Sequence, residues 1–199
     1  MAEWKDFLSK IKSMGKINMK ILNQKMTDKK FISYIYSQKW RPWDRKITRI
    51  IMHHTSSPIE SWKNSGSMLH YYNLYNSRGW KAGPHIFIAP NGIWLFTPIK
   101  KEGKCSANIA NKGSIHIEIV GRYFNHSPEN ESIRYLAGLV AEVLLSNFGL
   151  KEQDIFTHYS FDSESNCSPW VGREWLKACH KEYKELIHRT IYENTNFAS

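Results

Sequence analysis

Short apolar runs bounded by polar or turn-forming residues recur through the middle of the chain, and this pattern is typical of β-strands. Two of the runs are separated by Pro90-Asn91-Gly92, a sequence that favours a hairpin. We therefore expect an antiparallel pair at that point and further strands on either side. The predicted strands are 47–54, 84–89, 93–98, 114–120 and 154–157.

Between these strands, apolar residues recur at intervals of three and four, which predicts amphipathic helices. Helices are expected at 59–76, 131–147 and 172–189, and Gly149 lies just past the end of the second. Strands that alternate with helices indicate an α/β domain with a mixed central sheet flanked by helices. The buried stripe predicted for the second helix comprises Ile133, Leu136, Ala137, Val140 and Leu144.

Residues 1–40 precede this pattern and are expected to form a basic, partly helical N-terminal extension. Residues 1–46 contain 12 Lys or Arg and 4 Asp or Glu, so they hold most of the net charge of +10. We divide the chain into the extension at 1–40, one domain at 41–190 and a C-terminal tail at 191–199. The apolar stripe of the extension comprises Trp4, Phe7, Leu8, Ile11 and Met14.

A basic amphipathic arm is attracted to polyanions, such as an anionic wall polymer or a membrane surface. The sequence contains no regular aromatic-basic readout motif, so we expect no specific nucleic-acid partner. The first residues are not followed by an apolar segment of the kind found in secretory signals, so synthesis in the cytoplasm without a classical signal peptide is expected.

His53, His158 and Cys167 could form a zinc site. Zinc accepts imidazole nitrogen and thiolate sulfur, and a catalytic site leaves its fourth position to water. Cys167 follows His158 by nine positions through a polar, turn-rich segment that could bring both to one ion. The alternative is an ordinary strand-end histidine and a buried cysteine. Strand alternation places His53 and His54 on opposite faces without ranking them.

Glu118 lies in the middle of a mostly apolar strand. The isoleucines at 115, 117 and 119 share one face of this strand, and His116, Glu118 and Val120 share the other. A buried carboxylate is costly without a partner, so either a catalytic role or a salt bridge to a nearby Lys or Arg would account for it.

Four stretches of the chain, in their order, resemble those of zinc-dependent N-acetylmuramoyl-L-alanine amidases, the family type that includes phage amidase endolysins and peptidoglycan recognition proteins. The resemblance extends over roughly residues 45–188 and implies a mixed sheet with flanking helices. It also implies Zn²⁺ bound by His53, His158 and Cys167, with Glu118 as the general base. The stretches are IIMHHTSSP at 50–58, GWKAGPHIFIAPNGIW at 79–94, SIHIEIVG at 114–121 and THYSFDSESNCSPW at 157–170.

The implied function is hydrolysis of the amide between the lactyl group of N-acetylmuramic acid and L-alanine, with peptidoglycan as substrate and the bacterial cell wall as the place of action. A non-catalytic peptidoglycan-binding module is the alternative, and loss of a zinc ligand would favour it. Trp80 and Tyr72 are candidate substrate-binding residues in a groove wall, although aromatic side chains here could equally pack a helix on the sheet.

The chain departs from the family pattern in ways that affect transition-state stabilisation. His116 stands where the family has glycine, Pro84 where many members have tyrosine, and Ser165 where phage members often have lysine. Ser168 also separates Cys167 from the following proline. We regard His85 and His116 as possible auxiliary catalytic residues, with Lys104 a further candidate.

Overall fold

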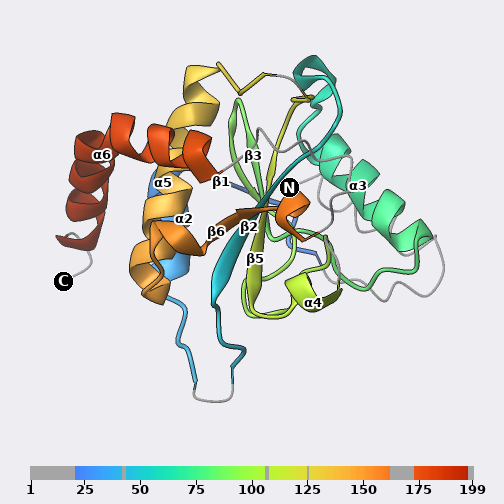
Figure 1. Ribbon diagram of the computed structural model, residues 1–199, viewed down its shortest axis with the longest axis horizontal. Coiled ribbons are helices and arrows are strands. Elements are labelled where there is room, and N and C mark those ends of the chain that lie inside the picture. The colour runs from blue at the N-terminus through green and yellow to red at the C-terminus, as the bar shows by residue number, and fades with distance from the viewer. Residues whose placement is uncertain (1–20, 42–43, 106–107, 125, 162–172, 197–199) are drawn as a thin grey trace, which may run out of the picture.

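The computed structural model describes residues 21–41, 44–105, 108–124, 126–161 and 173–196, which form a mixed sheet between two helical layers (Figure 1). This confirms the predicted fold class. Helices α2, α5 and α6 lie on one side of the sheet, and α3 lies on the other. The helices are α2 (Asp28–Tyr36), α3 (Ser65–Ser77), α4 (Asn108–Asn111), α5 (Glu131–Phe148) and α6 (Arg173–Asn196).

The six strands of the described residues follow the spatial order β1-β4-β3-β5-β2-β6. β2 pairs in parallel with β5 and β6, and β3 pairs in parallel with β5, whereas β4 is antiparallel to both β3 and β1. The central strands are therefore parallel, and an antiparallel hairpin completes one side. The strands are β1 (Gln24–Met26), β2 (Arg49–His54), β3 (Ile86–Ala89), β4 (Gly92–Leu95), β5 (Ser114–Ile119) and β6 (Ile155–Thr157).

The hairpin between β3 and β4 forms where the sequence predicts it. Ala89 pairs with Gly92, so Pro90 and Asn91 make a two-residue turn. Gly92 has a φ of 141°, a backbone conformation that side chains with a Cβ rarely adopt. Glycine at this position allows the chain to reverse and enter β4 directly.

Alternation along the strands gives the sheet two different faces. The face toward α2, α5 and α6 is aliphatic, and the isoleucines at 115, 117 and 119 lie in it with Ile50 and Met52. The face toward α3 carries a largely aromatic cluster instead. That cluster comprises Met68, Tyr71, Tyr72, Tyr75, Phe87, Ala89, Trp94, Phe96 and Val120.

Helix α5 covers the aliphatic face and has clear local signals at both ends. The Asn130 side chain accepts a hydrogen bond from the backbone N–H of Ile133 at 3.1 Å, which caps the start of the helix. Gly149 ends the helix in the left-handed conformation, with a φ of 61°. The predicted stripe is buried along this helix, where its side chains join the aliphatic core.

Residues 24–36, which the sequence analysis assigns to the N-terminal extension, build part of the domain. β1 pairs with β4, and the backbone N–H of Leu22 donates to Phe96 O at 2.8 Å. On α2, Phe31, Ile32 and Ile35 are buried in the aliphatic core. The predicted boundary at residue 40 therefore follows, rather than precedes, the first core elements. The apolar stripe predicted at residues 4–14 lies outside the described residues.

Helix α6 is longer than the predicted 172–189 and continues to Asn196, so most of the expected tail is helical. Within the described ranges, no helix combines the length and apolarity needed to cross a bilayer.

Candidate functional site

The site begins where the parallel strands β2 and β5 run side by side. Their register places His53 opposite Glu118 and Ile51 opposite His116. Residues paired in register project to the same side of a sheet, so His53, His116 and Glu118 share the face that also carries the aromatic cluster. The pairing brings together groups separated by more than sixty positions in the sequence.

His53 is buried and lies close to two other imidazoles. Its Nε2 is 3.1 Å from Nδ1 of His116, and its ring centre is 4.8 Å from that of His158. Burial, followed by the neighbouring histidines, holds the pKa of His53 well below the ordinary value. The ring is therefore neutral near pH 7, which is the form of imidazole that binds metals.

His158 reaches this group because β6 pairs in parallel with β2, with Met52 opposite Thr157. His158 follows directly as the first residue of a short 3₁₀ helix, so parallel strands bring both predicted histidine ligands to one edge of the sheet. Two imidazoles on one tetrahedral zinc ion have ring centres about 5 Å apart when Zn–N is near 2.0–2.1 Å. The observed spacing fits that arrangement. Cys167, the third predicted ligand, lies outside the described residues.

The second strand histidine, His54, has a different environment. Its Nδ1 accepts a hydrogen bond from the backbone N–H of Ser56 at 3.1 Å, and its ring meets Phe124 edge-on at 5.1 Å. The structure thus separates the two histidines as alternation requires, and only His53 lies with His116 and His158.

Glu118 is buried, with only 5% of its surface exposed. The thiol of Cys105 donates a hydrogen bond to its Oε1 at 3.0 Å, and Oε2 has no hydrogen-bond partner in the described structure. Burial raises the pKa of Glu118 to about 7, against the smaller lowering effect of the Cys105 hydrogen bond. No Lys or Arg among the described residues forms an ion pair with this carboxylate. Within that part of the chain, a salt bridge therefore does not account for the buried Glu118.

His85 is held behind the site by main-chain hydrogen bonds. Its Nδ1 accepts from the backbone N–H of His116 at 2.9 Å, so the ring proton must lie on Nε2, which donates to Lys101 O at 3.0 Å. Burial and the adjacent Arg45 lower its pKa to about 3. Nδ1 is thus held by the backbone of β5, and Nε2 lies between Lys101 O and Arg45 Nη2, which is 2.9 Å away. This arrangement positions β5 and suits a structural role.

His116 is fully buried and stacks on His85 with ring centres 5.8 Å apart and planes 1° from parallel. Its Nδ1 faces His53, while its Nε2 has no hydrogen-bond partner in the described part of the chain. Burial, followed by His85 and Arg45, lowers its pKa well below the ordinary value. His116 is therefore a second neutral imidazole in contact with His53.

The two candidate substrate-binding aromatics occupy different positions. Tyr72 is fully buried within the aromatic cluster, so its position is that of a packing residue and gives no support to substrate contact. Trp80 is only partly buried. Its ring stacks on Tyr75 at 5.3 Å, and Lys104 Nζ lies 5.3 Å from its centre. Substrate contact by Trp80 stays a prediction.

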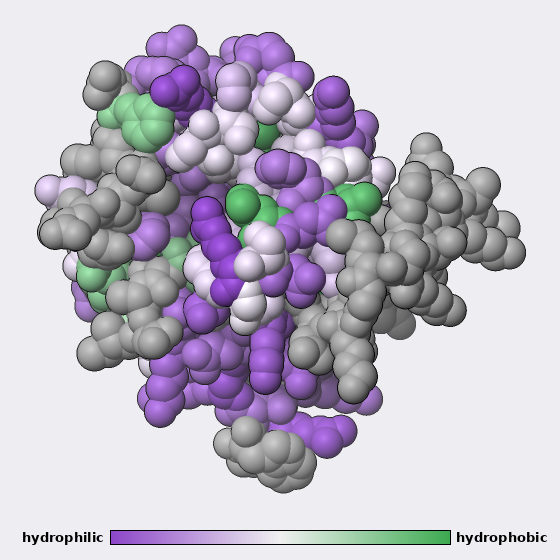
Figure 2. Space-filling view, turned by 90° about the vertical axis from the view of Figure 1, so that its right-hand side faces the viewer, coloured by the Kyte–Doolittle hydropathy of each residue, from purple (hydrophilic) through white to green (hydrophobic). Residues whose placement is uncertain are grey.

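A groove of about 390 Å³ opens beside the site, between the ends of β2 and β5 and helix α3. Thr55 and Val120, each two residues beyond His53 and Glu118, form its inner wall, and Trp62 and Tyr71 contribute aromatic surface. From the α3 side, the visible described surface is mostly hydrophilic, with small separate hydrophobic patches (Figure 2). The groove thus combines ring surfaces with polar surroundings, as a glycopeptide would require.

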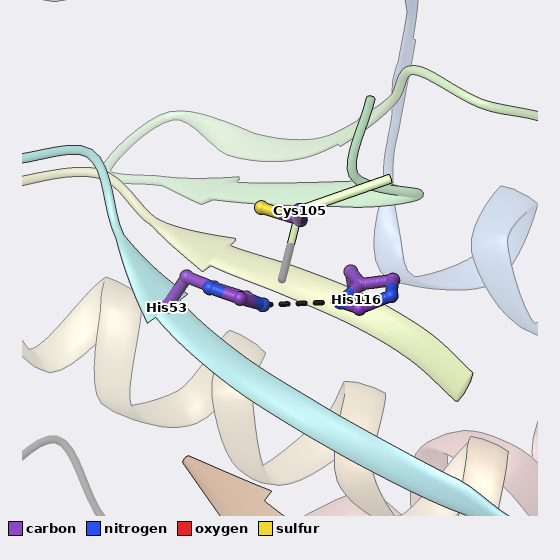
Figure 3. A group of neighbouring side chains, drawn as sticks. All are labelled: His53, Cys105 and His116. Atoms are coloured by element: carbon purple, nitrogen blue, oxygen red, sulfur yellow. Dashed lines mark hydrogen bonds between the residues drawn. The ribbon is translucent and has the colours of Figure 1, made fainter. Parts of the chain in front are cut away.

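Cys105, to which the sequence assigns no role, also lies in the site. Its Sγ and one ring nitrogen each of His53 and His116 lie within 4.8 Å of one another, and all three side chains are buried (Figure 3). Within the described residues, these three side chains lie close enough together to bind one metal ion. Cys105 comes from the loop between β4 and α4, where no spacing pattern could have revealed it.

Comparison with known families gives a match over the region that contains these residues. The profile of the N-acetylmuramoyl-L-alanine amidase family matches residues 43–174, about two thirds of the chain. No curated protein sequence matches the chain.

Solved structures show the same fold at low sequence identity. The N-acetylmuramoyl-L-alanine amidase LysC from Clostridium intestinale is 19% identical, with a TM-score of 0.55, and the match covers 71% of this chain and 92% of that one. The Ph2119 endolysin from the Thermus scotoductus bacteriophage Ph2119 is 18% identical, with a TM-score of 0.56 and coverage of 74% and 95%. Drosophila PGRP-LB is 18% identical, with a TM-score of 0.53 and coverage of 67% and 79%.

Proposed function

Because the chain belongs to the N-acetylmuramoyl-L-alanine amidase family, we propose that it is a zinc-dependent enzyme that cleaves the amide between the lactyl group of N-acetylmuramic acid and L-alanine in peptidoglycan. The observation that carries the zinc-dependent mechanism is the close approach of His158 to the buried, neutral His53, which pairs in register with the buried Glu118. Bound zinc would polarise the scissile carbonyl and lower the pKa of a water molecule to about 7.

His53, His158 and Cys167 are the proposed ligands. The donor chemistry fits, because two imidazoles and one thiolate are a set that zinc accepts while leaving a position for water. The lowered pKa of His53 supports this role, since the ring need not lose a proton before it binds. Cys167 enters the set from the sequence resemblance alone.

Glu118 is the proposed general base. A carboxylate whose pKa is about 7 is partly ionised at neutral pH, and it can both accept a proton from water and return it to the leaving amine. The two oxygens differ: Cys105 holds Oε1, whereas Oε2 makes no hydrogen bond to described residues. Oε2 is therefore the proposed proton-accepting atom.

The groove beside β2 and β5 is the proposed binding site for the glycopeptide. Trp62 and Tyr71 offer aromatic surface to sugar rings, and Lys63 and His70 offer donors for carbonyl or carboxylate groups of the stem peptide. The groove would hold the glycopeptide and position its amide near the proposed metal site.

The decisive test is product analysis after incubation of the full chain with purified peptidoglycan. Mass spectrometry should detect new L-alanine amino termini and intact muramic acid lactyl groups. A chelator should stop their release, and added Zn²⁺ should restore it. New reducing sugar ends in their place would contradict the proposal. Tight peptidoglycan binding with no product would favour the alternative, a non-catalytic binding module.

Residues 1–20 are the part of the N-terminal extension proposed to bind an anionic wall polymer or membrane surface. The elements that follow them belong to the domain core. Removal of residues 1–20 should weaken binding to whole walls or anionic vesicles, chiefly at low ionic strength. The truncation should stop there, since Leu22 and β1 bond to the sheet. Unchanged wall binding at low salt would refute the targeting role.

A further inference from the structure

We infer that His53, Cys105 and His116 form a second metal-binding donor set, distinct from the proposed His53, His158 and Cys167, and suited to a thiophilic divalent cation such as Zn²⁺ or Co²⁺. The two sets share only His53. Cys105 and His116 come from the loop after β4 and from β5, respectively. The inference concerns metal binding and does not depend on the proposed amide hydrolysis.

The first support is the distance between ligand atoms. The chosen atoms of the three residues lie within 4.8 Å of one another. His53 Nε2 and His116 Nδ1 are 3.1 Å apart, and two nitrogens on a tetrahedral zinc ion lie about 3.3 Å apart when Zn–N is near 2.0 Å. A cation could thus replace the proton shared by the two rings after only a small movement. Figure 3 shows these rings facing each other, with the Cys105 sulfur beside them.

The second support is that His116 has no evident structural anchor for its side chain. The neighbouring His85 uses both ring nitrogens in hydrogen bonds to main-chain groups. His116 is equally buried, yet its Nδ1 faces only His53, and its Nε2 makes no hydrogen bond within the described residues. The ligand atom in this set is Nδ1, and metal binding there gives a function to a fully buried imidazole whose ring nitrogens make no hydrogen bond to the main chain in the described structure.

The third support is the position of the thiol proton. Cys105 must lose its proton to bind a cation as a thiolate. The carboxylate oxygen Glu118 Oε1 lies 3.0 Å from Sγ and is a ready acceptor. Binding would therefore form one S–metal bond and transfer one proton from sulfur to the carboxylate, or onward to solvent, without any oxidant or reductant.

Because both sets use His53, and a neutral imidazole coordinates one ion at a time, the two sets compete for a single cation. The inference therefore predicts that loss of Cys167 does not abolish thiolate ligation. The chain would retain one bound cation per molecule, now held through Cys105. A chain with only the His53, His158 and Cys167 set would lose thiolate ligation altogether.

The experiment uses the metal-free full chain and Co²⁺ as the probe, because thiolate-bound Co²⁺ gives a sulfur-to-metal charge-transfer band. Cys167→Ser should bind one Co²⁺ with this band present. The Cys105→Ser/Cys167→Ser double variant should lack the band. Cys167→Ser/Cys179→Ala is the matched control and should retain it, since Cys179 is buried against α5 and remote from the site. Circular dichroism of each protein establishes that it is folded.

A second variant gives an independent check. His116→Asn in the Cys167→Ser protein should raise the Co²⁺ dissociation constant by about tenfold or more, because one of three ligands is lost. A folded Cys167→Ser protein without the band, or a double variant that retains it, would overturn the second donor set.

The single variant Cys105→Ser separates this inference from the proposed function. A band retained there shows that Cys167 supplies the other thiolate, as the proposed ligand set requires. If the band is lost in Cys105→Ser but kept in Cys167→Ser, the result supports the second donor set and refutes Cys167 as a ligand. Absence of amidase activity would refute the proposed function without affecting either spectroscopic result.

Discussion

The two faces of the central sheet come from the same strands but differ in chemistry. On β5, the isoleucines at 115, 117 and 119 pack under the helical layer of α2, α5 and α6, whereas His116 and Glu118 face the opposite side. The aliphatic face can be stabilised by any side chains of suitable volume and shape. The other face buries titratable groups, and their burial costs free energy unless they are paired or hydrogen-bonded. The alternation of side chains along a strand therefore places residues for stability and residues for chemistry on opposite faces of one element.

The greatest loss is expected for Glu118→Gln, which removes the proposed proton carrier while conserving the shape of the side chain. We expect kcat to fall about 10²–10⁴-fold, the usual contribution of a general acid–base group, with little change in zinc content or melting temperature. Release of L-alanine amino termini from peptidoglycan is the measurement. Full turnover in a zinc-loaded variant would remove Glu118 from the catalytic role.

The next largest effect tests the opposite face of the same strand. Ile117→Ala should lower the free energy of unfolding by about 2–5 kcal/mol, because Ile117 is almost completely buried in the aliphatic core. Ile117→Val is the milder control and should cost about 0.5–1.5 kcal/mol. Denaturant unfolding gives both values. Activity per folded molecule should stay near that of the wild type; a catalytic loss as large as that of Glu118→Gln would break the distinction between the faces.

A smaller effect is expected at Gly103, which packs against the ring of His85. A Cβ at this position would lie 2.4 Å from His85 Cε1 and 3.0 Å from Gly83 O. His85 is held by main-chain hydrogen bonds, so Gly103→Ala should cost about 1–3 kcal/mol of stability. Gly66→Ala is the control, because its nearest neighbour is 3.8 Å away and no loss is expected. Equal unfolding free energies for the two variants would show that His85 moves aside for the added Cβ at no cost in stability.

The smallest effect concerns the helical layer over the aliphatic face, where His180 Nε2 on α6 lies 2.6 Å from Glu142 Oε2 on α5. This hydrogen bond raises the pKa of His180 above 6.5. The same bond lowers the pKa of Glu142 below 4.5. The His180 contribution is complete below pH 6.5 and is lost as pH rises through its raised pKa. The Glu142 contribution is complete above pH 4.5 and is lost as pH falls through its lowered pKa.

The pair should therefore stabilise the protein most between pH 4.5 and 6.5. In that window His180→Gln should lower the free energy of unfolding by about 1 kcal/mol, and the difference should shrink at about pH 9. His188→Gln is the control, because His188 is more exposed and lies 3.5 Å from Glu142 Oε1. A His180→Gln effect that does not vary with pH would exclude the charged pair as its cause.

The fold was largely predictable because most elements carry a strong local pattern. The five predicted strands correspond to β2 to β6, and the helix predicted at 131–147 is α5, within one residue at its end. β1 escaped prediction, since Gln24–Met26 is too short to show alternation and forms by pairing with β4. The helix predicted from residue 59 begins at Ser65 after a separate 3₁₀ turn, because Trp62, the residue after that turn, is extended.

The site was predictable only in part, because strand alternation fixes faces but not contacts. It placed His116 and Glu118 on one face and separated His53 from His54, and the structure agrees. It could not show that Cys105 would reach Glu118, since a loop residue acquires its neighbours through the tertiary fold. Nor could it distinguish His85 from His116, whose roles depend on which ring nitrogens meet the main chain.

An anomalous difference map from crystals grown with zinc would show directly whether the α3-facing side of the sheet is the proposed metal-dependent catalytic centre. We predict one strong peak at the edge of the sheet, with Zn–N distances of about 2.0–2.1 Å to both His53 and His158. A zinc peak away from both histidines, with His53 Nε2 still hydrogen-bonded to His116 Nδ1, would contradict this assignment.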